Sequence, residues 1–469
     1  MTIFKVLNIT ARRGAARVMA GVCGLLCLMT SAAVALEQYT AHGGPVKHLT
    51  LSPDGSLMVS SSFDYSAVVW SVPELADTAT LIGHDAAVNV AMFTPDGDWL
   101  VTGGDDNQIL LWSVADILSF GDEAVPFVLQ GHYGKIVDFA FSSDGRYLVS
   151  ASWDGFVGLW DMALARNRLE QIPFMFRGHD GPVNDVQFSA DDKHLFSAGY
   201  DGHIRYWRVS DGEYLRSVIR NGWGVNVMLA DETRNILAYG STDGAMVLAE
   251  LDTGTDILRM GEDRVPVLSV GLNLQSNQIA FGNAKGQMKI VDLNSTTLLR
   301  DFRAANGPIW SVMFMPQNGD MMIASLDDFI TKWQIHDFPP EILDTPGPTR
   351  RFHPAAEISN GERQFARKCS VCHTLVPDGA RRAGPTLYNL FGRQAGTLPG
   401  YKYSKALLES DIIWGEETIH RLFTDGPDVV TPGTKMPIQR MKNEADRQDL
   451  IAYLKQATTP ASNLEREKR

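Results

Sequence analysis

The stretch GHYGKIVDFAFSSDGRYLVSASWDGFVGLW, residues 131–160, decides the fold of most of this chain. Its pattern recurs at residues 83–112 and 178–207, as GHDAAVNVAMFTPDGDWLVTGGDDNQILLW and GHDGPVNDVQFSADDKHLFSAGYDGHIRYW. Each copy places turn-forming residues such as Asp-Gly between short β-prone runs, which favours turn-rich β structure. Internal repetition of this kind dominates residues 36–337 and is the main clue to the architecture.

Four of the copies share one set of four residues at fixed spacing. A histidine lies 28 residues before a tryptophan, an aspartate lies six residues before that tryptophan, and a serine or threonine lies four residues before the aspartate. The sets are His42, Ser60, Asp64 and Trp70; His84, Thr102, Asp106 and Trp112; His132, Ser150, Asp154 and Trp160; and His179, Ser197, Asp201 and Trp207. This spacing suits a four-stranded unit whose tight turn is fixed by a buried chain of hydrogen bonds.

The copies resemble WD repeats, a family whose four-stranded blades contain such a chain of Asp, His, Ser or Thr, and Trp. Counting on from residue 207 in steps of 42 residues brings the number of copies to seven at residue 333. The resemblance therefore implies an all-β seven-bladed propeller over residues 36–337, closed because an open ring would expose sheet edges. It also implies that the segment LEQYT, residues 36–40, completes the last blade.

The fifth, sixth and seventh copies are degenerate. None of them begins with Gly-His, and Lys285 replaces the turn aspartate in the sixth copy. We interpret the repeated histidines, aspartates and tryptophans as structural, because their spacing serves the turn of each blade. The propeller is then expected to be a platform for an unidentified protein ligand. Outside the sets it keeps His48, His194, His203 and His336, too few for a dense copper-binding ring.

Charge and the N-terminal segment indicate where the protein works. A formal net charge of −13 argues against nucleic acid as a partner, because phosphate binding needs a basic surface. Residues 1–35 combine basic residues, an apolar run at 18–29 and the sequence Ala-Val-Ala at 33–35, which predicts a secretory signal peptide. We therefore expect an exported, periplasmic protein. The alternative is a retained segment that anchors the protein in the membrane.

A second domain follows the repeats. Residues 338–354 are rich in proline and predict an extended linker, residues 355–459 make up the second domain, and residues 460–469 form a charged tail. Residues 36–349 contain 19 Lys and Arg against 41 Asp and Glu, whereas residues 350–459 contain 16 against 12. Surface acids are usually only solvated. The alternative is that the acidic propeller attracts a basic partner or the second domain.

The motif KCSVCHT, residues 368–374, carries the chemistry of the second domain. A structural zinc site would need two further ligands at matching spacing, and the exported chain would have no second cysteine pair. A thioredoxin-like pair would open a helix of a βαβ unit, whereas the flanking segments here have no strand pattern. Cys-x-x-Cys-His lets Cys369 and Cys372 form thioethers with a haem while His373 reaches the iron, which favours one covalently attached haem c.

A sixth ligand for that iron is expected in VTPGTKMPIQRM, residues 430–441. Met436 is the candidate, because a thioether suits low-spin iron, raises the reduction potential and leaves no open position for a substrate. The predicted metal ligands are thus His373 and Met436. Met441 is the alternative, although a methionine is more often a core residue than a ligand.

Residues 358–457 resemble a class I cytochrome c of the mitochondrial and bacterial type, an all-α domain. The matching stretches are GERQFARKCSVCHT, GPTLYNLFGRQAGTLPGYKYS, IIWGEETI, PGTKM and DLIAYLKQAT. The resemblance implies that Gly361 and Phe365 on the first helix cross Leu450 and Tyr453 on the last. It further assigns haem-pocket positions to Pro385 as acceptor for His373, to Arg393, Tyr403 and Trp414 near the haem propionates, and to Thr434 beside the methionine loop. Leu407 stands where the family often has an asparagine.

These features predict a periplasmic c-type cytochrome that carries single electrons, with the WD-repeat propeller as its interaction platform. The expected redox partners are a quinol–cytochrome c reductase, an oxidase or another periplasmic reductase. No catalytic residue is assigned, because an iron with two axial ligands is an electron carrier rather than an enzyme site. The alternative is a redox enzyme whose propeller houses an additional active site fed by the haem. A third hypothesis is a haem-bearing scaffold without electron traffic.

Overall fold

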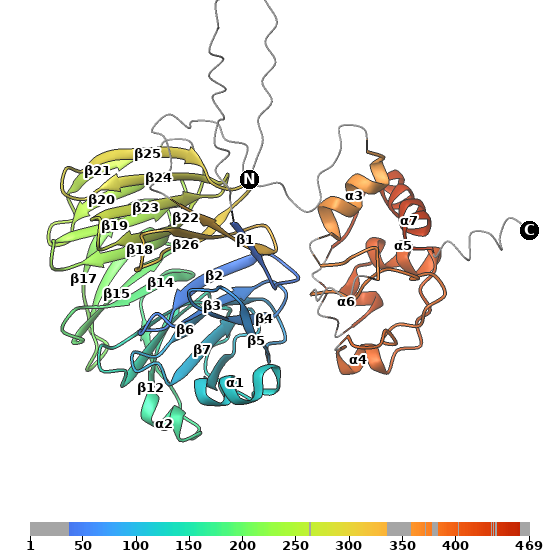
Figure 1. The fold of residues 1–469 in the computed structure, drawn as a ribbon, viewed down its shortest axis with the longest axis horizontal. Helices are drawn as coiled ribbons and strands as arrows, with labels where there is room; N and C mark the ends of the chain where they lie inside the picture. Colours follow the sequence, from blue (N-terminus) through green and yellow to red (C-terminus); the bar gives the residue numbers. More distant parts are fainter. Residues whose placement is uncertain are drawn as a thin grey trace, which may run out of the picture. The chain divides into compact units, whose positions relative to one another are not determined.

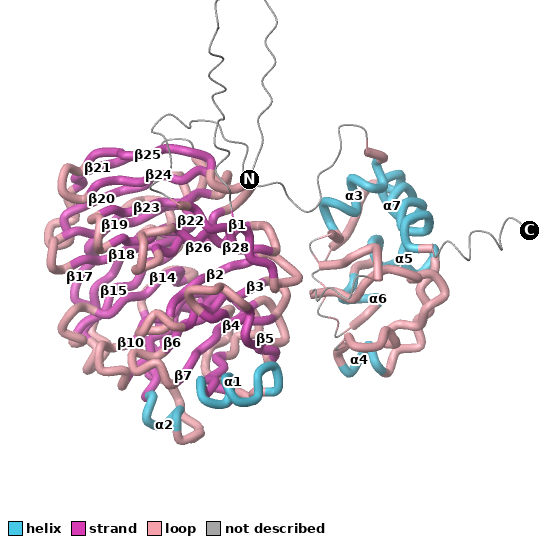
Figure 2. Tube along the Cα trace, in the orientation of Figure 1, coloured by secondary structure: helices cyan, strands magenta, loops and turns pink. Residues whose placement is uncertain are grey.

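A computed structural model describes residues 37–261, 264–334, 358–370, 372–377, 383–401, 403–432, 434, 436 and 439–459. These residues form a β-propeller and a helical domain, the multidomain arrangement predicted from the sequence (Figure 1; Figure 2). The predicted signal segment 1–35, linker 338–354 and tail 460–469 lie outside the described residues. Among the described residues, no helix has both the length and the apolar character needed to cross a membrane.

The propeller consists of seven antiparallel four-stranded sheets, in agreement with the seven copies in the sequence. In the first six blades the strands pair in chain order, and the first strands of neighbouring blades pack against one another around the axis. Blades 1 and 2 contain β2 (Val46–Leu51), β3 (Leu57–Ser62), β4 (Ser66–Ser71) and β5 (Asp77–Ile82); β6 (Val88–Phe93), β7 (Trp99–Gly104), β8 (Ile109–Ser113) and β9 (Phe127–Leu129). Blades 3 and 4 contain β10 (Ile136–Phe141), β11 (Tyr147–Ser152), β12 (Phe156–Asp161) and β13 (Phe174–Arg177); β14 (Val183–Phe188), β15 (His194–Gly199), β16 (His203–Arg208) and β17 (Tyr214–Arg220).

The remaining blades are built in the same way, except that the last is completed by the start of the chain. Blades 5 and 6 contain β18 (Val225–Asp231), β19 (Ile236–Ser241), β20 (Met246–Glu250) and β21 (Asp256–Met260); β22 (Val267–Asn273), β23 (Gln278–Asn283), β24 (Gln287–Asp292) and β25 (Thr297–Arg303). Blade 7 contains β26 (Ile309–Phe314), β27 (Met321–Ser325), β28 (Phe329–Trp333) and β1 (Glu37–Thr40). Because β1 pairs antiparallel with β28, the ring closes as the sequence predicted.

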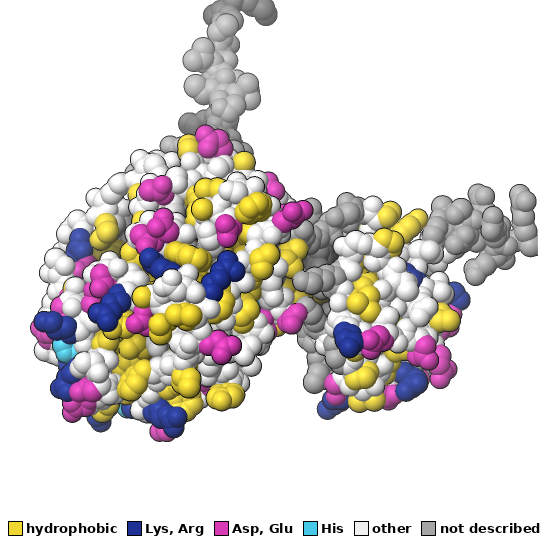
Figure 3. Space-filling model, turned by 90° about the horizontal axis from the view of Figure 1, so that it is seen from below, with side chains coloured by type: hydrophobic (Ala, Val, Ile, Leu, Met, Phe, Trp, Pro, Cys, Tyr) yellow, Lys and Arg dark blue, Asp and Glu magenta, His cyan; other side chains and the backbone are white. Residues whose placement is uncertain are grey.

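Short helical turns occupy two connections between third and fourth strands. They are α1 (Val114–Phe120), the 3-10 turn η1 (Gly121–Glu123) and α2 (Met162–Arg166). On the face of the molecule that Figure 3 shows, acidic and basic side chains are interspersed with exposed apolar ones.

The four-residue sets form the expected hydrogen-bonded chains. In blade 3, Nδ1 of His132 donates to Asp154 at 2.8 Å, the Ser150 hydroxyl lies 2.7 Å from Nε2, and the Trp160 indole donates to that hydroxyl at 2.9 Å. The same contacts in the other three blades measure between 2.7 and 3.1 Å. Trp160 is fully buried, so each polar atom of the chain obtains from its neighbour the hydrogen bond that water would otherwise supply.

Two of the three degenerate blades, the fifth and the sixth, replace this chain by exchanging side-chain volume between two strands, whereas blade 7 keeps the buried Trp333. In blade 5, Tyr239 occupies the serine position and Ala249 the tryptophan position, and both are buried. Blade 6 makes the same exchange, with Phe281 in the serine position and Val291 in the tryptophan position. A large and a small residue have changed places, so the packed volume is retained without the polar chain. The hydroxyl of Tyr239 instead accepts a hydrogen bond from Arg259 at 3.2 Å.

Five helices are described in the second domain, which is all-α as predicted. They are α3 (Asn360–Lys368), α4 (Lys405–Leu408), α5 (Glu416–Thr424), α6 (Pro427–Val430) and α7 (Glu444–Thr458). The hydroxyl of Ser359 caps α3 and the side chain of Asn443 caps α7, so both helices begin where the sequence supplies an N-cap residue. Their contact, together with buried side chains from α5, builds the core of the domain.

The crossing of α3 and α7 depends on a glycine, as the sequence analysis expected. A Cβ atom on Gly361 would lie 2.1 Å from the carbonyl oxygen of Asp449, well inside contact distance. The aromatic rings of Phe365 and Tyr453 lie 5.9 Å apart beside this crossing, and Leu450 is fully buried. The first helix therefore approaches the last with backbone against backbone, which only glycine permits.

Candidate functional site

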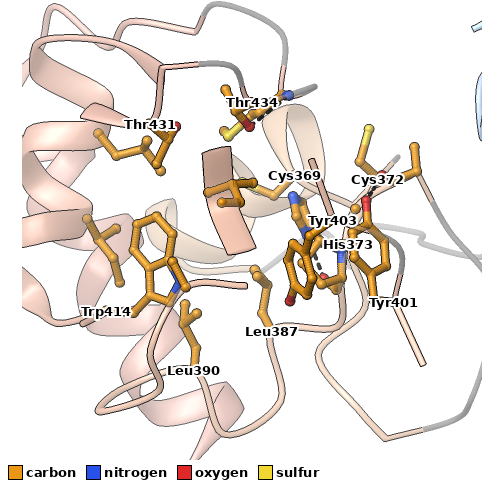
Figure 4. Close-up of a pocket in the computed structure, with 18 of the residues that line it drawn as sticks. Cys369, Cys372, His373, Leu387, Leu390, Tyr401, Tyr403, Trp414, Thr431 and Thr434 are labelled. Atoms are coloured by element: carbon orange, nitrogen blue, oxygen red, sulfur yellow. Dashed lines mark hydrogen bonds between the residues drawn. The ribbon is translucent and has the colours of Figure 1, made fainter. Parts of the chain in front are cut away.

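The end of α3 presents the two cysteines and the histidine of the motif to one cavity. The backbone N–H groups of Cys372 and His373 both donate to the carbonyl of Cys369, at 3.0 and 2.8 Å, which folds the motif into a tight turn. Cys369 is buried and Cys372 is half-buried. Burial, and secondarily the neighbouring Cys372, raises the pKa of Cys369 to about 12. The turn thus places two thiols and an imidazole side by side (Figure 4).

Two contacts hold the imidazole ring of His373 in one orientation. Nδ1 of His373 donates to the carbonyl oxygen of Pro385 at 2.7 Å. Because that oxygen can only accept, the proton lies on Nδ1 and the lone pair on Nε2. The ring also lies so close to Gly384 that a Cβ atom there would be 2.3 Å from Cε1. A hydrogen bond and a flat glycine backbone together fix the ring as a metal-ligating histidine requires.

The cavity brings together every site residue predicted from the sequence. The lining includes Cys369, Cys372, His373, Pro385, Arg393, Tyr403, Trp414, Thr434 and Met436, and also Leu407. Met441, the alternative to Met436, is 5% exposed, belongs to the hydrophobic core and is not among the lining residues. The geometry therefore favours Met436 over Met441 as the residue that faces a bound group.

The loop after α6 carries Met436 and Thr434 to the cavity. The N–H of Met436 donates to the Thr434 hydroxyl at 3.2 Å, and the N–H of Thr434 donates to the carbonyl of Thr431 at 3.0 Å. Thr431 is buried and its hydroxyl donates to the carbonyl of Pro427 at 2.9 Å. Local hydrogen bonds thus anchor this loop to the end of α6 and position Thr434 as the resemblance implied.

One wall of the cavity carries polar groups that are already engaged with the backbone. The guanidinium of Arg393 donates to the carbonyls of Tyr388 and Thr386 at 3.0 and 2.8 Å. Burial lowers the pKa of Arg393 and raises that of Tyr403, so burial disfavours the charged form of both groups. The rings of Tyr401 and Tyr403 meet edge to face at 4.7 Å, and the Tyr401 hydroxyl donates to the carbonyl of Ala383.

The other walls are apolar, with two unsatisfied polar atoms among them. Leu387, Leu390, Ile419, Leu422, Phe423 and Leu454 all line the cavity. The hydroxyl oxygen of Ser404 and the amide oxygen of Gln439 are buried at its surface, and neither has a hydrogen-bond partner among the described residues. An apolar slot with a few convergent polar atoms suits a flat macrocycle that carries charged edge groups. The residues present therefore fit a haem, which the two thiols would attach and the imidazole would ligate.

Besides the apolar residues of the lining, four residues with a specific contact or role at the cavity were not predicted from the sequence. They are Gly384, Tyr401, Ser404 and Gln439, all of which line the cavity. Tyr401 lies two residues before Tyr403 in the stretch GYKYS, so its neighbour could have indicated it. Gln439 gives no such signal, because its role depends on a contact with the carbonyl of Lys368, 71 residues away in sequence.

Fold and site define the class: a WD-repeat propeller joined to a c-type cytochrome domain. Residues 34–71, 76–113, 125–161 and 170–208 match the WD40 family (WD domain, G-beta repeat), and residues 358–458 match the family Cytochrome c. The chain belongs, through these last residues, to the cytochrome c family, and its domain carries a covalently attached haem c. Electron transfer is the function that this family implies.

Similar proteins match the second domain over nearly their whole length. Cytochrome c of Sesamum indicum is 45% identical over 105 residues, which cover 94% of that protein and 22% of this chain. Cytochrome c of Chlamydomonas reinhardtii is 44% identical over 105 residues, covering 93% of it and 22% of this chain. Cytochrome c of Gibberella zeae is 39% identical over 102 residues, covering 95% of it and 22% of this chain. The haem domain is therefore a complete cytochrome c in extent, and the propeller is a separate addition.

Proposed function

We propose that this protein is a periplasmic electron carrier whose haem iron is ligated by His373 and Met436. The observation that supports the proposal is that both residues line one cavity: the imidazole of His373 is fixed through Nδ1, and the N–H of Met436 is bonded to the hydroxyl of Thr434. When bound, the haem would supply a one-electron couple, and His373 and Met436 would hold its iron. The chain's own residues attach it, orient the imidazole and exclude water from the apolar side of the slot.

A periplasmic location is proposed on two grounds. The N-terminal segment has the composition of an export signal, and a cytochrome with thioether-bound haem is expected on the exported side of the membrane. The expected electron donors and acceptors are a quinol–cytochrome c reductase, an oxidase or another periplasmic reductase. The repeated His, Asp, Ser or Thr, and Trp side chains of the propeller form hydrogen bonds within their own blades, so we assign them no part in catalysis. The propeller would instead dock the cytochrome domain onto a partner protein.

The ligand assignment is tested by comparing two methionine variants in a host that matures c-type cytochromes. Met436→Ala is expected to keep the covalent haem, lose the weak red absorption band of ferric methionine-ligated haem and shift the reduction potential downward. Met441→Leu is the matched control, because it removes the other methionine sulphur but keeps the core volume. Loss of the band in Met441→Leu and its retention in Met436→Ala would contradict the assignment.

An iron and metal count separates the carrier from the alternative enzyme. The carrier requires one iron for each chain and no second cofactor, whereas an active site in the propeller requires a further haem or metal. Within the described residues, no group of three or more His, Cys, Asp or Glu side chains is arranged to hold a metal ion. Purified holoprotein with two irons, or with copper, would favour the enzyme. A haem that a reductase cannot reduce and an oxidase cannot oxidise would favour the third hypothesis, a haem-bearing scaffold without electron transfer.

A further inference from the structure

The segment 439–441, which ends the methionine loop between α6 and α7, is anchored by hydrogen bonds to other elements. The guanidinium of Arg440 pairs with the carboxylate of Asp428, on α6, at 2.8 Å. The N–H of Met441 donates to the carbonyl of Phe423, on α5, at 2.8 Å. These two contacts attach the end of the loop to the helices that precede it.

Gln439, in the same segment, makes a contact in a different direction. Its side-chain nitrogen donates to the carbonyl of Lys368 at 3.2 Å, and Lys368 is the last residue of α3. The next residue is Cys369, the first cysteine of the haem-attachment motif. This hydrogen bond therefore connects the loop that carries Met436 to the helix that leads into the motif.

The same hydrogen bond fixes the orientation of the Gln439 amide. Because the Lys368 carbonyl can only accept, the amide nitrogen faces it and the amide oxygen points elsewhere. That oxygen is buried at the surface of the cavity and has no hydrogen-bond partner among the described residues. A buried acceptor without a partner destabilises the fold, so its presence at this position needs an explanation.

A bound haem would not supply the missing donor. The polar groups at the edge of a haem are propionates, which accept hydrogen bonds when they are ionised, and the amide oxygen of Gln439 can also only accept. The hydroxyl of Ser404, the other unpaired group at the cavity, differs because a hydroxyl can donate to a propionate. Ser404 therefore suits the charged edge of a haem, whereas Gln439 presents the negative end of a dipole without forming a bond.

A dipole at this position acts on the charge of the bound group. The other walls of the cavity are apolar, so water screens the amide dipole of Gln439 only weakly. A ferric haem carries one more positive charge than a ferrous haem. The negative end of the dipole consequently stabilises the ferric form more than the ferrous form, which lowers the reduction potential.

We propose that Gln439 is a positioning residue that also sets the reduction potential: its amide nitrogen ties the methionine loop to α3, and its unpaired amide oxygen stabilises the oxidised haem. The inference rests on the proposed function, since it names a residue that adjusts the haem of the electron carrier. The potential then depends on this amide as well as on the two axial ligands.

The test measures the reduction potential and the weak red methionine band of the full-length holoprotein. Gln439→Met keeps the volume but removes the donor and the oxygen, so the haem and its band should be retained at 25 °C, the band should disappear at a lower temperature on heating, and the potential should rise. The ferric-to-ferrous equilibrium should shift by about threefold or more, or about 30 mV at about 59 mV for each tenfold change.

Gln439→Glu should shift the potential in the opposite direction. As the pH is raised from 5 to 9, its carboxyl gains a negative charge that favours ferric haem, so its potential should fall relative to that of the unaltered protein. A residue that only anchors the loop would give a different result. Both variants would then weaken methionine ligation, and loss of the methionine ligand lowers the potential in both.

Gln394 provides the matched control. Its side chain also donates to a backbone carbonyl, that of Ser410 at 2.9 Å, but it is exposed and is not among the residues that line the cavity. Gln394→Met and Gln394→Glu should leave the band unchanged and move the potential much less, because water and salt screen an exposed charge.

A potential that is unchanged or lower in Gln439→Met, or one that rises with pH in Gln439→Glu relative to the unaltered protein, would overturn the proposal. If Gln439→Met does not retain haem, Gln439→Leu provides the same comparison. Absence of the methionine band from the unaltered protein would instead contradict the ligand assignment, and the potentials of the Gln439 variants would still test the role of the amide oxygen.

Discussion

The propeller and the cytochrome domain both bury polar side chains, but they complete the hydrogen bonds of these side chains differently. In blade 3 the carboxylate, imidazole, hydroxyl and indole satisfy one another, and the backbone N–H of Tyr133 completes the set. In the part of the cytochrome domain that the structure describes, the hydroxyl oxygen of Ser404 and the amide oxygen of Gln439 are buried without a hydrogen-bond partner. A closed polar network indicates a structural role, whereas unsatisfied atoms that line a cavity indicate space for a bound group.

Removing the haem attachment should produce the largest difference between the two domains. With Cys369→Ala and Cys372→Ala together, covalent haem should be lost completely, and the helical domain should lose cooperative folding because its core surrounds the cavity. The propeller should unfold at its usual temperature, since its core consists of side chains alone. Haem absorbance and near-ultraviolet circular dichroism of the buried tryptophans report the two domains. A propeller transition that shifts with the haem would contradict the comparison.

The contact of α3 with α7 tests whether the cytochrome domain also depends on packing that involves no haem. Gly361→Val should destabilise this domain by roughly 3–5 kcal/mol, because the added atoms would meet the Asp449 carbonyl. Gly415→Ala is the control, since nothing lies within 4 Å of a Cβ atom there, and it should cost under about 1 kcal/mol. Thermal unfolding followed by haem absorbance measures both. Equal effects of the two variants would show that the helix crossing is not tightly packed.

Within the propeller, the complete and degenerate blades allow a smaller, paired test. Ser150→Ala should destabilise the propeller by about 2–3 kcal/mol, because it leaves Nε2 of His132 and the Trp160 indole without partners in a buried place. Tyr239→Phe removes only the hydroxyl that Arg259 contacts, and should cost about 1 kcal/mol or less. Chemical denaturation of the apo and holo proteins measures both values. If Tyr239→Phe destabilised the propeller more than Ser150→Ala does, the hydrogen-bonded chain of blade 3 would not be the more important of the two arrangements.

Much of the fold could be predicted because its signals are local and repeated. The sets of blades 1–4 have constant spacing, and the motif from Cys369 to His373 binds its cofactor within five consecutive residues. The exchange of Tyr239 with Ala249 could not be predicted from the repeat pattern, because each residue alone breaks the pattern and only the folded core shows that both are buried in one cluster.

The same distinction holds for the haem site. The polar residues near the motif and in the methionine loop follow from the family resemblance, and the structure places them around one cavity. Gly384 and Gln439 were not predicted from that resemblance. Gly384 is needed because a side chain there would collide with the imidazole ring of His373, and Gln439 contacts the carbonyl of Lys368 at the end of α3. The spacing of residues in the sequence identifies the expected haem ligands. Steric contacts such as that of Gly384, and buried polar atoms without partners such as the amide oxygen of Gln439, can be recognised only in the folded structure.

The propeller also buries a pair of carboxyl groups, which lies between blades 3 and 4. Asp138 accepts the N–H of Val186, and Asp185 accepts the N–H of Met228, each at 2.9 Å. Burial raises the pKa of Asp138 to about 7, and burial together with the neighbouring Asp138 raises that of Asp185 well above its usual value. The two carboxyls therefore share a proton near neutral pH.

Since these pKa values are raised above the unfolded value of about 4, the pair is most favourable below pH 4 and loses stability as the pH rises through about 7. Asp185→Asn removes one charge while keeping an oxygen that can accept the N–H of Met228. The variant should therefore gain stability over the unaltered propeller at pH 8, on the order of 1 kcal/mol, and gain less at pH 5. Asp252→Asn, at an exposed aspartate, should show no such dependence. Denaturation midpoints of both proteins at pH 5 and pH 8 measure this difference. If the stability gained by Asp185→Asn were the same at both pH values, the two carboxyls would be ionised like surface carboxylates.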